Sequence, residues 1–207
     1  GLTATPFRPD KRPLSDLFGE AVFTMDLIQG MQQGYLADID YRMLHDGIDW
    51  EELAALSQTG RTIKDLNSRL IMPDRDASMV DVFAEHVKSI QDPKALIFCR
   101  SIPHAERIQV QLTAQGVSAA VFHSKKHRSE NFRAMSRFKR GEVQALVSVE
   151  ALNEGVDVPD VNLIAFMRVT HSRRIFIQQL GRGLRIQEGK TSVRVLDFVA
   201  DIRRVAE

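Results

Sequence analysis

Residues 95–207 alternate short apolar runs with segments of helical periodicity, and this pattern constrains the fold more than any other feature of the chain. Continuous apolar runs predict buried strands at Ala95–Cys99, Val117–Phe122, Ala145–Val149, Leu163–Met167 and Val193–Val199. Strands that alternate with helices at these lengths form βαβ crossovers and a parallel sheet. The sequence therefore predicts one open α/β domain with a mostly parallel sheet.

Helical segments are expected between these strands. The first has Pro103 in its first turn and ends at Gly116. The second carries Phe132, Met135 and Phe138, which we expect on one buried face. Helices that alternate with parallel strands cover both faces of the sheet.

The first 94 residues are less regular. From Trp50 to about Ile90 the pattern is helical, with Ser78 as a candidate N-cap for the clearest helix. We expect Ile71–Ser78 to be a loop, because it contains Pro73 and several charges. These patterns divide the chain into 1–49, a helical insert or linker at 50–94, and the α/β domain at 95–207.

Charge is distributed unevenly along the 207 residues, although the formal net charge is only +1. Residues 1–94 contain 10 Lys and Arg against 16 Asp and Glu, whereas residues 95–207 contain 18 against 11. The second half is therefore basic, which favours an anionic partner. The alternative to an anionic partner is that these charged residues simply form solvent-exposed faces.

Cysteine and hydropathy limit the class of protein. Cys99 is the only cysteine, so no disulfide forms within the chain, and the six histidines form no zinc pattern with it. No apolar run reaches the roughly 18–20 residues of a membrane helix, and the first residues given lack the charged and apolar blocks that are typical of a signal peptide. We expect a cytoplasmic protein with no metal site and no membrane partner. The chain starts at Gly1 rather than Met, so we also expect it to be part of a longer protein.

Polar and basic residues follow the predicted strands. In open α/β sheets, ligands bind beyond the carboxyl ends of the strands. Arg100 and Ser101 follow the first of these strands, and His123 and Ser124 follow the second. We therefore expect an anion-binding edge, although loops are polar in any case.

Arg182 and Arg185 lie three residues apart near the end of a predicted third helix, within the segment Gln178–Arg185. The arginine fork matches phosphate oxygens. Gly181 and Gly183 are poor helix formers, so they suit a close approach of backbone or ligand. Spacing alone leaves two readings open, a phosphate site and two solvated arginines at a helix end.

A nucleotide cradle is not apparent in the sequence. Gly189-Lys190-Thr191 resembles the end of a phosphate-binding loop, but Gly183 is one residue too distant and a strand is predicted to follow. No Asp-Glu pair ends an apolar strand to hold magnesium. We expect this chain alone to lack a site that cradles a nucleoside triphosphate.

Four segments in order resemble the superfamily 2 helicases and translocases, from their third motif onward. They are Leu2–Pro6 (Leu-Thr-Ala-Thr-Pro), Ala95–Ser101, Ala145–Pro159 and Gln178–Arg185, which resemble motifs three to six. The residues of the last two motifs are most similar to the DEAD/DEAH-like group with the type III restriction-enzyme helicase subunits. The DEAD-box group, whose third motif reads Ser-Ala-Thr, is less similar.

The resemblance implies a RecA-like fold for residues 95–207 and places 1–49 at the end of a first RecA-like domain with its connection. ATP and Mg²⁺ would be held mainly by that first domain, which would be a partner of this one. Arg185 would be the arginine finger that reaches the γ-phosphate, Arg182 would assist it, and Gln178 would organise the site. Further residues near the nucleotide would be Glu154, Gly155 and Asp157.

The resemblance also implies residues for nucleic-acid binding. Contacts with the backbone would come from Arg100, Ser101, His123 and Ser124, and Thr3 and Thr5 would couple the nucleotide site to the strand-binding face. Val149 departs from the family pattern, in which a threonine contacts phosphate.

The expected function is that of an ATP-dependent helicase or translocase on nucleic acid, with DNA favoured. This chain alone would be inactive because it lacks the Walker A and B motifs. The alternative is a non-catalytic nucleic-acid-binding or assembly module with a helicase fold, although such a module has no need of the arginine pair. The sequence leaves open DNA or RNA, unwinding or translocation, polarity, an associated nuclease, the role of residues 50–94 and the oligomeric state.

Overall fold

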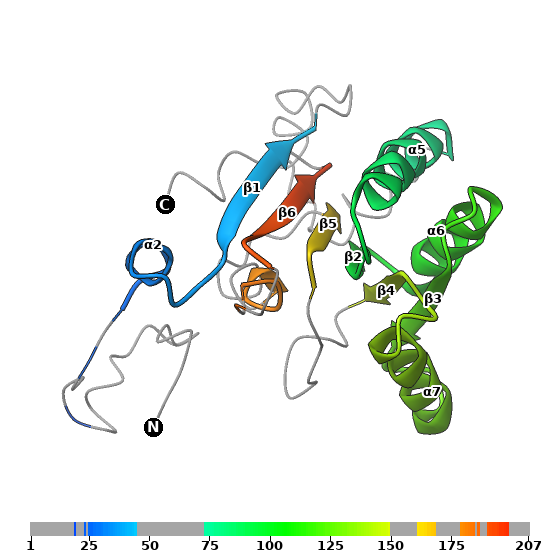
Figure 1. The fold of residues 1–207 in the computed structure, drawn as a ribbon. Coiled ribbons are helices and arrows are strands. Elements are labelled where there is room, and N and C mark those ends of the chain that lie inside the picture. The colour runs from blue at the N-terminus through cyan, green and yellow to red at the C-terminus, as the bar shows by residue number, and fades with distance from the viewer. Residues whose placement is uncertain are drawn as a thin grey trace, which may run out of the picture.

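The central strands form because their residues are apolar without interruption. β2 (Ala95–Cys99) and β5 (Leu163–Met167) are buried at every residue, and β4 (Ala145–Val149) at all but its last. Such strands need cover on both faces. The computed structural model describes residues 19, 23, 25–44, 73–149, 161–168, 179–184, 186 and 190–198, in which these strands form the middle of a six-stranded sheet (Figure 1).

The sheet has the strand order β1-β6-β5-β2-β4-β3, and every neighbouring pair is parallel. The two edge strands are β1 (Asp38–Met43) and β3 (Ala119–His123), and β6 (Ser192–Asp197) lies between β1 and β5. The strands predicted at 95–99, 145–149 and 163–167 are confirmed to the residue, and those near 117 and 193 are confirmed with ends shifted by one or two positions. The predicted α/β class is therefore confirmed.

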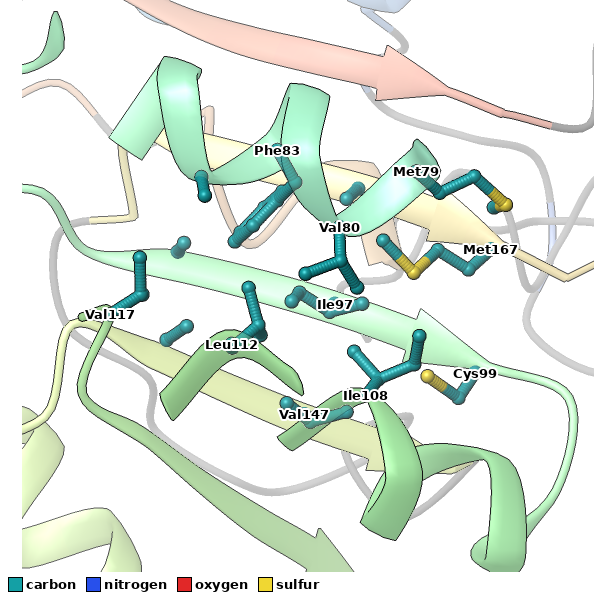
Figure 2. Packing of buried hydrophobic residues seen from close by; sticks show 14 of the residues in the cluster. Met79, Val80, Phe83, Ile97, Cys99, Ile108, Leu112, Val117, Val147 and Met167 are labelled. Atoms are coloured by element: carbon teal, nitrogen blue, oxygen red, sulfur yellow. The ribbon is translucent and has the colours of Figure 1, made fainter. Parts of the chain in front are cut away.

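Helices cover both faces of the sheet. α5 (Pro73–Ser89) and α6 (Ile102–Ala114) pack on one face, whereas α7 (Arg128–Lys139) packs on the other. The short α2 (Leu27–Gln32) adds Leu27 to the α7 face. Figure 2 shows the first face, where side chains of α5 and α6 meet those of the central strands; among them are Val80, Phe83, Ile97, Ile108, Leu112 and Val147.

The helix ends follow the expected chemistry. Ser101 is the N-cap of α6, with Pro103 in the first turn. Gly116 follows α6 with φ of +80°, a conformation that costs glycine nothing. The limits predicted for this helix from Pro103 and Gly116 are confirmed.

Two elements outside residues 95–207 pack with the sheet. β1, which lies within 1–49, pairs in parallel with β6 from Asp38 opposite Ser192 onward. α5, which lies within 50–94, contributes Phe83 and Val87 to the core. The divisions after residues 49 and 94 stay predictions, but the sheet together with its packed helices draws on all three intervals.

The loop predicted at Ile71–Ser78 is wrong from residue 73 onward, because α5 begins at Pro73 and Ser78 lies inside it rather than at its N-cap. Proline is favoured in the first helical turn, where its missing N–H would have no intrahelical partner. The same residue therefore marks a start rather than a break.

Phe132 is also placed differently from the prediction. Met135 and Phe138 are buried on the inner face of α7, but Phe132 is 71% exposed. Six residues of an α-helix leave Phe132 and Phe138 about 120° apart around the axis, so the two rings do not share a face. The predicted stripe thus holds for two of its three residues.

Candidate functional site

The carboxyl ends of the strands meet at one edge of the sheet, because all six strands are parallel. Cys99 at the end of β2 pairs with Met167 at the end of β5, and His123 at the end of β3 pairs with Val149 at the end of β4. The residues that follow these strand ends therefore gather at this carboxyl edge. They include Arg100, Ser124 and Arg168, as the strand pattern predicts.

Arg100 lies in a buried ion pair at this edge. Its Nη2 donates to Asp76 Oδ1 at 3.1 Å and to Oδ2 at 3.0 Å, and the two side chains are 2% and 0% exposed. Asp76 comes from the first turns of α5, which thereby reaches the carboxyl edge. Arg100 is one of the residues for which the resemblance implies a contact with the nucleic-acid backbone. In this structure its charge is balanced by the Asp76 carboxylate.

Two further cationic or titratable side chains face Asp76. His104 Nε2 lies 3.3 Å from Asp76 Oδ1, and Arg107 Nη1 lies 3.6 Å from Oδ2. His104 is buried, whereas Arg107 is partly exposed. We call Asp76, Arg100, His104 and Arg107 the Asp76 cluster.

The protonation states in the Asp76 cluster follow from burial and charge. Burial alone would raise the pKa of Asp76, but the contacts with His104 and Arg100 outweigh it and hold the pKa below its ordinary value. Burial lowers the pKa of His104, and the Arg100 charge lowers it further against the opposing effect of Asp76. Asp76 is therefore an anion beside a neutral His104, and the cluster keeps a net positive charge through its two arginines.

Ser101 and the β3–α7 turn complete the described part of the edge. Ser101 Oγ accepts a hydrogen bond from the His104 N–H at 3.3 Å and so caps α6. The His123 carbonyl accepts from Lys126 N at 3.1 Å and from Asn131 Nδ2 at 2.9 Å, which fixes the turn. His123 is buried, and its Nδ1 has no hydrogen-bond partner in the described part of the chain, whereas Ser124 is exposed. The nucleic-acid roles of these residues stay predictions.

Arg182 lies on a turn whose next residue, Gly183, packs closely against the sheet. A Cβ at Gly183 would lie 2.6 Å from Val193 Cγ2 and 2.9 Å from Ile164 Cδ1, so only glycine fits. The sequence predicted such a close approach, and at Gly183 it is confirmed. Leu180 and Leu184 on either side are buried in the core of the α7 face.

The turn and the carboxyl edge lie at different parts of the sheet. Ile164 and Val193 are near the amino ends of β5 and β6, and the Leu184 carbonyl accepts from Ala37 N at 3.0 Å, just before β1. The structure therefore separates Arg182 from Arg100 rather than bringing them together. Arg182 is partly exposed, with interactions of its own.

Several predicted site residues lie outside the described residues, so the structure does not place them. They are Thr3, Thr5, Glu154, Gly155, Asp157, Gln178 and Arg185. Their roles stay predictions.

The sequence missed Asp76. Asp76 falls in the segment predicted as a loop, and the signal that could have found it was an acidic residue just after a proline that starts a helix. Arg168 directly follows the apolar run of β5 and is buried, with interactions of its own. The described part of the chain has no group of three or more His, Cys, Asp and Glu side chains that could hold a metal ion, and no helix that could span a membrane.

Comparison with known proteins identifies the family. The model of the helicase conserved C-terminal domain matches residues 78–187, which is more than half of the chain. This chain belongs to that family. The resemblance to superfamily 2 helicases, stated from four motifs, is confirmed at the level of this C-terminal domain.

Two curated relatives carry helicase names. The chain is 22% identical over 199 residues to a Saccharomyces cerevisiae protein assigned as the ATP-dependent helicase IRC3, covering 96% of this chain and 29% of the relative. It is 31% identical over 195 residues to a protein of African swine fever virus that is named a probable helicase, covering 91% and 21%. The chain thus spans less than a third of either relative.

A solved structure supports the fold over nearly the whole chain. It is a fragment assigned as the HsdR subunit of a type I restriction enzyme from Vibrio vulnificus, with a TM-score of 0.73 and 25% identity. The match covers 99% of this chain and 40% of that one. The RecA-like fold of the helicase C-terminal domain is therefore shown.

Proposed function

We propose that this chain is the second RecA-like half of an ATP-dependent helicase or translocase that acts on nucleic acid, with DNA as the favoured substrate. The observation that carries the proposal is the family match over residues 78–187, since the whole segment Gln178–Arg185 falls inside it. The lengths of the relatives support the view that a first RecA-like domain lies in the same protein, outside this chain.

The chemistry of the arginine segment fits phosphate better than metal. Arg182 and Arg185 offer permanently charged donors, which suit phosphate oxygens and cannot ligate Mg²⁺. ATP and Mg²⁺ would be held by the partner domain, and this chain would add positive charge from the opposite side. Glu154, Gly155 and Asp157 would line the same side.

The contribution of such an arginine is large. Phosphoryl transfer depends on positioning and on neutralising charge in the transition state, and an arginine finger supplies roughly 10³–10⁵ in rate. Gly183 supports this role, because its contact with Ile164 and Val193 fixes the backbone on which Arg182 lies. In our proposal Gln178 orients Arg182 and Arg185. Thr3 and Thr5 couple the nucleotide site to the bound nucleic-acid strand.

The carboxyl edge would contact the nucleic-acid backbone. Ser124 is exposed and can reach a phosphate directly. Arg100 would contact phosphate only after releasing Asp76, so its role depends on that exchange. Binding through phosphates should weaken as salt rises.

The test uses the complete protein that contains this chain. ATP hydrolysis is measured with single-stranded DNA, duplex DNA and RNA. We expect nucleic acid to stimulate hydrolysis, and Arg185→Ala to lower kcat by roughly 10³-fold or more while nucleotide binding persists. Arg140→Ala is the control, because Arg140 is exposed and pairs with Glu142 on the surface.

Two results would contradict the proposal. An unchanged kcat in Arg185→Ala would remove the finger assignment. Nucleic-acid binding without any ATP hydrolysis by the complete protein would instead favour the non-catalytic module.

A further inference from the structure

The outer side of α7 carries an exposed aromatic ring among cations, and no role proposed above uses it. Phe132 is 71% exposed, whereas Phe138 on the same helix is 0% exposed. We define the α7 outer surface as Phe132 with Lys125, Arg128 and Arg133. All four residues are exposed.

The charge of this surface is strongly positive. Residues 125–133 contain four Lys and Arg against one acidic residue, Glu130. Within the described part of the chain, Lys125, Arg128 and Arg133 have no ion pair or hydrogen bond through their side chains, whereas Arg137 and Arg140 both pair with Glu142. These three exposed cations are therefore available to an anionic partner.

Glu130 forms an ion pair with none of these three cations in the part of the chain that the structure describes. Its carboxylate accepts a hydrogen bond from the His127 N–H at 3.3 Å as part of a capping box. Glu130 and Phe132 are two residues apart, so they do not face each other on a helix, whereas Arg128 and Phe132 lie four apart on one face. The ring thus shares one side of α7 with Arg128, which lies one turn earlier.

The position of α7 connects this surface with the carboxyl edge. α7 begins at Arg128, five residues after the end of β3, so Lys125 and Ser124 belong to the turn that joins the two. α7 lies on the opposite face of the sheet from α5 and α6 (Figure 1). A nucleic-acid strand that leaves the carboxyl edge at Ser124 can therefore continue along α7, away from α5.

We propose that the α7 outer surface binds a single-stranded segment of nucleic acid, with one base stacked on Phe132 and neighbouring phosphates on Lys125, Arg128 and Arg133. An exposed ring among cations matches the two parts of a single strand, a free base face and a charged backbone. In a duplex the base faces are stacked on one another, so the ring would have nothing to contact. Pairing of two copies through this same surface is disfavoured, because it would bring like charges together. The proposal rests on the function proposed above, since it extends the strand path from the carboxyl edge.

The test measures binding of a fluorescently labelled oligothymidylate to the complete protein by anisotropy. Phe132→Ala should weaken binding by roughly 5- to 100-fold, the range measured for removal of one stacking side chain. Val110→Ala, which removes an apolar side chain that is 63% exposed on α6, is the matched control and should leave the affinity unchanged.

A second variant reports stacking directly. Phe132→Trp should keep the affinity, and its fluorescence should be quenched by the oligothymidylate beyond any change in the parent protein, to which this chain contributes only Trp50. The variant Arg128→Glu with Arg133→Glu should lower the slope of log Kd against log salt by about 0.7 for each phosphate that it no longer binds. Lys88→Glu on α5, an exposed residue on the other face, is its control.

The outcomes separate this proposal from the proposed function. If Phe132→Ala binds the oligothymidylate as tightly as Val110→Ala does, the α7 proposal is overturned, even if Phe132 contacts a protein. An equal loss of affinity for a blunt duplex also overturns it, because the ring would then not stack on a free base. The function proposed above fails separately, if the parent protein shows no ATP hydrolysis with any nucleic acid.

Discussion

Asp76 on α5 and Arg100 at the end of β2 form a buried pair in which one guanidinium nitrogen, Nη2, donates to both carboxylate oxygens, at 3.1 and 3.0 Å. The two residues are 24 positions apart in the chain. The pair ties the first turns of α5 to the carboxyl edge of the sheet. A helix that the sequence assigned to an insert or linker therefore contributes to the candidate site.

Asp76→Asn should destabilise the protein strongly. It removes the charge that balances Arg100, and an uncompensated charge in the interior costs about 3–5 kcal/mol. The measurement is the free energy of unfolding from urea denaturation. Glu85→Gln, on the exposed side of the same helix, should change that free energy by less than about 0.5 kcal/mol. If Asp76→Asn lost as little unfolding free energy as Glu85→Gln does, the Arg100 guanidinium would have to be solvated rather than buried with an unbalanced charge.

Stability should fall as the pH drops below 6.5, the ordinary pKa of histidine. Burial, aided by the charge of Arg100, lowers the pKa of His104 in the folded protein, so the unfolded chain binds a proton that the folded chain does not. The unfolded state therefore gains from acid, and the stability that His104 contributes is complete above its unfolded pKa and decreases below it. Urea denaturation between pH 5 and 8, about the range in which histidine titrates, measures this slope.

His104→Gln should reduce the slope, and His127→Asn should retain it. His127 is an exposed N-cap of α7, and asparagine caps helices well. Part of the slope should survive in His104→Gln, because burial and the charge of Arg194 also lower the pKa of His86. An unchanged slope in His104→Gln would exclude His104 as its source.

The sheet could be predicted from the sequence because its central strands are fully buried. A strand covered on both faces must be apolar at every position, and Ala95–Cys99 and Leu163–Met167 are read directly from that rule. β1 could not be found in the same way. Its sequence, Asp-Ile-Asp-Tyr-Arg-Met, is polar at alternate residues, and its place beside β6 depends on a pairing between residues 38–43 and 192–197.

The site was predictable in part for a similar reason. Arg100 and Ser124 follow strand ends, so the parallel topology places them at one edge. That Arg100 is neutralised by Asp76 follows from tertiary packing of α5, which local spacing does not encode. The prediction for Phe132 failed because this aromatic residue was assigned to the apolar stripe of Met135 and Phe138. The helical period places Phe132 about 120° from Phe138 instead.

Gly183→Ala should destabilise the turn that carries Arg182. The new Cβ would lie 2.6 Å from Val193 Cγ2, and Val193 is a buried, β-branched residue in β6 that has little freedom to move. Overpacking of this kind costs about 1–3 kcal/mol. Urea denaturation measures the loss, and in the proposed function kcat for ATP hydrolysis should fall as well.

The addition of Val193→Ala tests the cause of that loss. Removing Cγ2 relieves the contact, so Gly183→Ala with Val193→Ala should lose less stability than the sum of the two single variants. Additive losses would mean that Gly183 is required for another reason than the contact with Val193.

Phe132→Ala and Phe138→Ala should differ sharply in stability, because the structure places one ring outside the core and the other inside it. Phe138 is 0% exposed and packs with Met135 against the sheet, so its truncation should cost about 3–5 kcal/mol of unfolding free energy. Phe132 is exposed, and its truncation should change that free energy by less than about 0.5 kcal/mol. Urea denaturation of the two variants decides between this arrangement and the predicted stripe, in which both truncations would be costly. A stable Phe132→Ala protein also ensures that any loss of nucleic-acid affinity in that variant reflects the ring itself.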